Sequence, residues 1–237
     1  MNNNADALLF THKVCVEASQ TLRIASVKSP SRISPRGLSA KRFDKEVSMN
    51  NKWNRNSAMW MLLYAVLYAI ATAAVCVTGS IHPIFFVCYQ ITAGLLLSPI
   101  IIRAFRRVQA PGAAVCLFLG ILLLLLIIRD AVMWHVVPLI VITILAEIVR
   151  ATAKYSRSGD IVATVLMCFS SFGYYGQIWF NRAYTYECAV EEMPAGYGDT
   201  LMSVSPVWAF PVVVAAGIIM SVLITNIYMK KHAGIDK

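Results

Sequence analysis

Apolar residues dominate the chain from residue 58 onward, in long runs separated by short polar segments. A helix needs about 20 apolar residues to cross the hydrocarbon core of a membrane. The pattern therefore predicts an all-α protein with six membrane-spanning helices. They are expected at residues 58–78, 84–104, 112–128, 134–153, 161–180 and 206–229. Ser205 and Pro206 mark the start of the last one, because serine caps a first turn and proline lacks the amide left unsatisfied there.

Residues 1–48 differ from the rest of the chain. They are rich in Ser, Lys and Arg, contain the stretch SPSRISPRG, and lack an apolar run long enough for a signal peptide. This composition predicts a disordered basic tail ahead of a membrane domain at 49–237. Met49 stands just before the first apolar run, which favours a translation start there. A basic arm lying on the membrane surface is the other interpretation.

The formal net charge of +9 has a topological explanation. Lys and Arg in short loops mark the cytoplasmic side of a membrane protein. With the N-terminus inside, only Arg129 and Arg182 of the Lys and Arg after residue 48 fall outside. The inner positions are Lys52, Arg55, Arg103, Arg106, Arg107, Arg150, Lys154, Arg157, Lys230, Lys231 and Lys237. We therefore expect cytoplasmic N- and C-termini, a lipid bilayer as the environment and no nucleic-acid partner.

Hydrophobic residues make up 58% of the chain, and its mean hydropathy is +0.65, more apolar than one soluble core requires. The six cysteines form no CxxC pair and no metal-ligand spacing with the histidines. We expect no metal and no cofactor. Catalytic signatures such as GxSxG, HExxH and a Walker A loop are missing from the sequence, so we predict that the chain is not an enzyme and does not hydrolyse ATP.

Polar and aromatic residues gather at the predicted external ends of the helices. Such residues serve either as interface anchors or as the directed groups of a ligand pocket, and the sequence leaves both open. The candidate substrate-binding residues are Trp134, His135, Gln177, Trp179, Asn181, Arg182 and Tyr184.

The external connection between the fifth and sixth predicted helices is acidic, with Glu187, Glu191, Glu192 and Asp199. Residues 187–193 are expected to form a short helix ended by Pro194. Gly196 and Gly198 would give flexibility before the chain re-enters the membrane. We interpret this segment as a mobile lid over a pocket, with its four acids solvated.

Small residues recur on several helices. Ala65, Ala69 and Ala73 form a stripe at intervals of four residues, suited either to internal packing or to a partner helix. Internal packing is favoured for Gly173, Gly176, Gly217 and Ser221. Glu147 is the acid placed well inside a predicted span, and its spacing from Arg150 favours an ion pair near the cytoplasmic surface over ion translocation.

Three segments resemble one family: LAEIVRATAKYSRSGD at 145–160, YECAVEEMPAGYGDTLMSVSPVW at 186–208 and KKHAGI at 230–235. They are similar to the Trep_Strep, or MptD-type, substrate-binding S components of energy-coupling factor importers. The resemblance implies a six-helix protein of a prokaryotic plasma membrane that binds a vitamin-like micronutrient externally. It also implies docking on a transmembrane T component carried by two ABC ATPases, with the alanine stripe as the interface.

In that family the partner's ATP hydrolysis tilts the S component and releases the substrate inward. Two other classes stay open: an ion-coupled secondary transporter using Glu147 or Asp130, and a membrane scaffold without a ligand. The charge of the substrate is also open. Arg129, Arg182 and His135 favour an anion, whereas the acids of the connection favour a cation.

Overall fold

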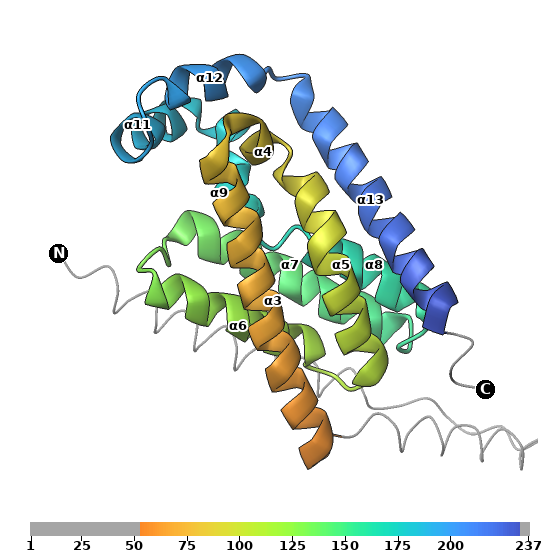
Figure 1. The fold of residues 1–237 in the computed structure, drawn as a ribbon. Helices are drawn as coiled ribbons and strands as arrows, with labels where there is room; N and C mark the ends of the chain where they lie inside the picture. The colour runs from red at the N-terminus through yellow and green to blue at the C-terminus, as the bar shows by residue number, and fades with distance from the viewer. Residues whose placement is uncertain (1–52, 233–237) are drawn as a thin grey trace, which may run out of the picture. The chain divides into compact units, whose positions relative to one another are not determined.

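The computed structural model describes residues 53–232, and within them all regular structure is helical (Figure 1). The predictions for the 1–48 tail, for Met49 as the start and for the last part of the KKHAGI segment lie outside the described residues. The helices are α3 (Arg55–Ile81), α4 (Pro83–Val87), α5 (Tyr89–Arg107), α6 (Ala113–Ile127), α7 (Met133–Thr152), α8 (Arg157–Met167), α9 (Phe172–Tyr175), α10 (Gln177–Phe180), α11 (Arg182–Glu192), α12 (Tyr197–Val204) and α13 (Ala209–His232).

Three of these helices, α3, α7 and α13, are long and apolar enough to cross a membrane. Helix α3 illustrates why. Tyr64, Tyr68 and Val75 lie on its buried face at helical spacing, while Leu62 and Ile70 on the opposite face are 68% and 61% exposed. A row of exposed apolar side chains along a long helix is suited to lipid rather than water. The described chain is thus an all-helical integral membrane protein.

The six predicted spans correspond unevenly to the helices. The first, fourth and sixth match α3, α7 and α13, and the third matches the shorter α6. The second is split at Cys88 into α4 and α5. The fifth, predicted as one helix over 161–180, is wrong as a continuous element, because the chain forms α8, α9 and α10 there.

Other helices satisfy the backbone carbonyls exposed by the break after α8. The Tyr68 hydroxyl on α3 donates to the Met167 carbonyl at 2.7 Å. The same Tyr68 hydroxyl lies 2.7 Å from the Ser170 hydroxyl. Gln90 on α5 donates from Nε2 to the Cys168 carbonyl at 3.3 Å. Because the Met167 and Cys168 carbonyls are paired, the helix can end at a buried position with little cost in free energy.

Small residues allow the helices to approach closely, as predicted. A Cβ on Gly120 of α6 would lie 2.5 Å from the Ala65 carbonyl oxygen of α3. A Cβ on Gly217 of α13 would meet Gln90 of α5 at 2.3 Å, and one on Gly173 would meet the Trp134 carbonyl oxygen at 1.9 Å. The internal-packing interpretation of Gly173 and Gly217 is therefore confirmed.

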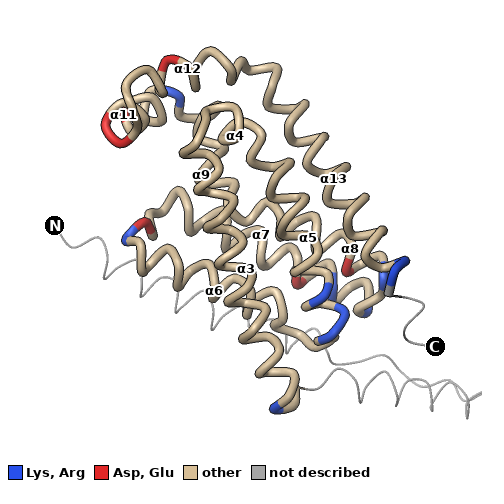
Figure 2. The backbone as a smooth tube through the Cα atoms, in the orientation of Figure 1, with Lys and Arg blue, Asp and Glu red and all other residues tan. Residues whose placement is uncertain are grey.

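Charged residues separate toward two ends of the helical domain (Figure 2). Apart from Arg129 and Arg182, the Lys and Arg of the described chain lie at one end, called here the basic end, formed by the start of α3 and α8 and by the last turns of α5, α7 and α13. The acids of α11 and α12 lie at the other end. The separation agrees with the charge pattern in the sequence, while the cytoplasmic location of the basic end stays a prediction.

The predicted ion pair between Glu147 and Arg150 is wrong. Arg150 is fully buried, and its Nε donates to the Asp160 carboxylate of α8 at 3.0 Å. Glu147 instead accepts from the Ala114 amide at the start of α6 at 2.6 Å, where a carboxylate complements the helix dipole. Residues three apart share a helix face, but partners on neighbouring helices are better placed for both side chains.

The external connection also differs in detail. The predicted short helix is present but longer, as α11, and it ends before Pro194 as expected. Gly196 has φ +82° and precedes α12, a helix that the glycine pattern did not indicate. Gly198 lies inside α12, where a Cβ would meet the Tyr186 ring at 3.2 Å, so it serves packing rather than flexibility.

Candidate binding cavity

A cavity of about 630 Å³ lies among the helices away from the basic end. Its wall is formed by the C-terminal halves of α3 and α6, the short helix α4, the α6–α7 connection, the start of α7, and α9 to α12. The volume falls in the usual range for small-molecule sites. Helices α11 and α12 lie over this part of the domain in Figure 1, so the acidic connection covers the cavity.

The covering helices are attached to the bundle at defined points. The Tyr197 hydroxyl at the start of α12 donates to the Gly79 carbonyl near the end of α3. Tyr186 on α11 donates to the Asp199 carboxylate on α12 at 3.0 Å, and this hydrogen bond raises the pKa of Tyr186. Burial raises the pKa of Tyr197. The two helices are thus joined to each other, and α12 is joined to α3.

Aromatic rings make up a large part of the wall. Tyr174 on α9 is the centre of this group, with the Phe86 ring 5.1 Å away and the His135 ring 5.6 Å away, measured between centroids. Tyr184 on α11 and Tyr197 on α12 also line the cavity. Such walls suit a ligand with a flat ring.

Ionisable groups enter the cavity from two sides. Arg129, Asp130 and His135 come from the α6–α7 connection and the start of α7, and Glu192 comes from the end of α11. His135 Nδ1 lies 3.1 Å from Asp130 Oδ2 and 3.1 Å from the Asp130 carbonyl oxygen. The four acids of the connection are exposed, as predicted, but the sequence did not place Glu192 in the wall of the cavity.

The candidate residues from the sequence divide into two groups. His135, Gln177 and Tyr184 line the cavity. Trp134 is 66% exposed on the surface of α7. Trp179, Asn181 and Arg182 are not in the wall either, and their role in substrate binding stays a prediction.

Trp179 and Arg182 have a structural role between α12 and α13. The Trp179 indole donates to the Pro206 carbonyl at 3.3 Å. Arg182 donates to the carbonyls of Ser205 at 2.6 Å and Met202 at 3.1 Å. These bonds satisfy the carbonyls between α12 and α13, where the helical pattern is interrupted.

The alanine stripe faces the interior of the domain. Ala65 is buried against α6 and Ala73 lines the cavity, while Ala69 keeps part of its surface exposed. A partner interface through the three residues stays a prediction, and Ala69 is the member best placed for it.

Thr72, Cys76, Tyr174 and Tyr197 also line the cavity, although the sequence did not single them out. Thr72 and Cys76 lie one turn apart on α3, on the side of the alanine stripe that ends at Ala73. The spacing of Thr72 and Cys76 beside Ala73 could have identified them in the sequence. That inference would first have required knowing that the alanine stripe faces a cavity.

An all-helical domain with three helices that are long and apolar enough to cross a membrane defines an integral membrane protein. Residues 57–233 match the family described as hypothetical bacterial integral membrane protein (Trep_Strep). The chain belongs to this family and is a bacterial integral membrane protein. No curated protein and no solved structure matches it.

Proposed function

We propose that the protein is a substrate-binding S component of an energy-coupling factor importer. The observation that carries this proposal is the cavity of about 630 Å³, placed at the end of the domain away from the basic end. If the basic end faces the cytoplasm, the cavity opens toward the outside, where an importer must capture its substrate. The resemblance in the sequence supports the same function.

In the proposed cycle, the substrate binds beneath α11 and α12. A T component with two ATPases then supplies the energy, and tilting of the S component releases the substrate inward. Of the two residues that an ion-coupled transporter would use, Glu147 accepts a hydrogen bond from the start of α6 and is not in the cavity wall, whereas Asp130 lines the cavity and pairs with His135. The position of Glu147 therefore supports an S component, and an Asp130→Asn variant that lost proton-driven uptake by the lone chain would support a self-sufficient transporter instead.

Filling the cavity tests the binding role. Ala73 lines the cavity, whereas its neighbour Ala74 is exposed on α3 and does not. We expect Ala73→Phe to abolish ligand-dependent thermal stabilisation of the purified chain, with a micronutrient found by screening as the probe. Ala74→Phe makes the same change on the lipid-facing side and should retain it. Equal behaviour of the two variants would contradict a binding role for this cavity.

Assembly tests the partner role. The chain should co-purify with a T component and two ABC ATPases after co-expression, and Ala69→Leu should reduce that yield while Ala74→Leu does not. Because Ala69 is partly buried, the thermal stability of each isolated variant is measured alongside. Lost assembly of a stably folded Ala69→Leu variant supports the interface. Unchanged assembly shows that the interface lies elsewhere, and wild-type chain that never co-purifies contradicts the S-component function.

A further inference from the structure

We propose that the cavity selects an organic cation, namely a flat aromatic ring that bears an ammonium or amidinium group. This inference rests on the proposed binding function and names the chemical class of its substrate. The sequence left the charge of the substrate open. The cavity wall shows which charged groups can reach one ligand.

Two carboxylates approach the same space from different elements. Asp130 comes from the connection between α6 and α7, and Glu192 comes from the last turn of α11. Both act on Tyr184: its hydrogen bond and charge interaction with Cys188 raise the pKa of Tyr184 most, and burial, Asp130 and Glu192 raise it further. The two acids therefore impose a negative field on the side of the cavity closed by α11.

His135 is paired with Asp130, and in its neutral form it adds an acceptor to the cavity. Its Nδ1 faces the carboxylate and the carbonyl of Asp130, each at 3.1 Å, and both of these oxygens are acceptors. The proton of neutral His135 therefore resides on Nδ1. The other ring nitrogen, Nε2, is then an acceptor.

Gln177 contributes a further acceptor. Its Nε2 donates to the Gly173 carbonyl at 2.9 Å, which fixes the orientation of the amide. Its Oε1 is buried and has no hydrogen-bond partner within residues 53–232. A buried acceptor without a partner is costly, and a ligand N–H group would satisfy it.

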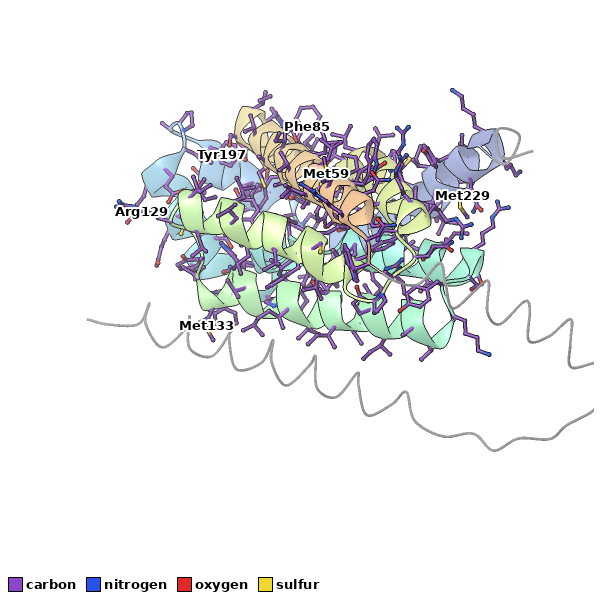
Figure 3. The ribbon with its side chains drawn as sticks, turned by 90° about the horizontal axis from the view of Figure 1, so that it is seen from below. Met59, Phe85, Arg129, Met133, Tyr197 and Met229 are labelled. Atoms are coloured by element: carbon purple, nitrogen blue, oxygen red, sulfur yellow. The ribbon has the colours of Figure 1, made fainter. Side chains whose placement is uncertain are left out.

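The basic residue in the wall does not balance these groups. Arg129 has φ 60° and is exposed to solvent, and Figure 3 shows it at the outer edge of the domain. Glu192 is exposed as well, so water screens both charges, and Arg129 remains one cation against the two carboxylates of Asp130 and Glu192. Inside, Phe86, Tyr174 and Tyr184 supply rings that attract cations as well as flat ligands. Acceptors and aromatic faces together match a planar cation.

The test uses three naphthalene compounds that differ in one substituent: 2-naphthamidine, 2-naphthamide and 2-naphthoate. Each is added to the full chain in lipid nanodiscs, and affinity is measured by calorimetry and thermal shift. We expect the amidinium compound to bind tightest and the carboxylate weakest. Glu192→Gln should weaken amidinium binding by about tenfold or more, because a charge-assisted hydrogen bond is lost.

Glu191→Gln is the matched control, since it removes the same charge one residue earlier on an exposed side chain outside the wall. It should leave the affinity unchanged. Tighter binding of the carboxylate, no binding of the amidinium compound, or equal effects of the two substitutions would overturn the inference. Those results would leave assembly with the T component and ATPases intact, whereas failure of assembly would overturn the proposed function itself.

Discussion

Replacing Asp160 with asparagine should destabilise the basic end of the domain more than any single surface change there. Asp160 on α8 and Arg150 on α7 have side chains with 0% exposure, and they pair at 3.0 Å. Arg150 also donates through Nη2 to the carbonyls of Phe105 at 3.3 Å and Val108 at 3.1 Å, and its guanidinium lies 4.1 Å from the centre of the Phe105 ring. One side chain thus connects α5, α7 and α8.

The expected cost follows from this burial. At an effective dielectric constant of about 20, two charges 3 Å apart attract by roughly 5 kcal/mol, part of which offsets the cost of removing them from water. Asp160→Asn leaves the guanidinium buried and unpaired. We therefore expect a loss of about 3–5 kcal/mol in the free energy of unfolding. Reversible unfolding in mixed micelles of dodecyl maltoside and sodium dodecyl sulfate measures it.

Arg106→Gln is the matched control, because Arg106 contacts the same carboxylate at 3.4 Å but its side chain is 41% exposed. Its loss should cost about 1 kcal/mol or less. Replacing Arg150 and Asp160 together by Met and Leu should recover much of the stability lost in Asp160→Asn. Equal effects of Asp160→Asn and Arg106→Gln would refute the assignment of Arg150–Asp160 as the buried pair that joins these helices.

Three further changes test other contacts. Glu147→Ala should cost about 1–3 kcal/mol in the same unfolding assay, because it leaves a buried amide at the start of α6 without an acceptor. Gly120→Val should cost about 1–3 kcal/mol or prevent folding, since its side chain would collide with the Ala65 carbonyl; an unaltered unfolding curve would contradict the close crossing of α3 and α6. Asp199→Asn should lower the pKa of Tyr186 toward its ordinary value in an alkaline ultraviolet titration, whereas an unchanged pKa would show that the two side chains do not interact in solution.

The apolar runs of the sequence locate the helices well, because burial in lipid depends mainly on local composition. They do not reveal where a helix breaks. The interruption after Met167 depends on Tyr68 and Gln90, which lie far away in the sequence and donate to the carbonyls left open. Hydropathy contains no information about such donors, so an interrupted helix and a continuous one look alike.

The sequence also does not reveal the partners of individual charged side chains. Arg150 stands three residues after Glu147, but its partner is Asp160, which approaches across the turn between α7 and α8. Arg182 suggested an anion site in the sequence, yet it donates to carbonyls at the end of α12. A charged side chain in a helical membrane protein can satisfy a broken backbone as readily as it can hold a ligand. The sequence alone does not separate these uses.

The two ends of the domain are held by different kinds of contact, and this bears on where a ligand can enter. At the basic end, one buried guanidinium joins three helices and a buried carboxylate holds the start of a fourth. At the cavity end, α12 is joined to α3 through Tyr197, whereas Ala189 is the buried residue of α11. Moving α11 would leave the buried pair of the basic end and the bond between Tyr197 and Gly79 intact, and would break the bonds of Tyr186 to Asp199 and of Arg182 to Ser205 and Met202. Since Glu192 and Tyr184 lie on α11, the same displacement would open the cavity and withdraw one of its carboxylates, so ligand entry and recognition are linked through one helix.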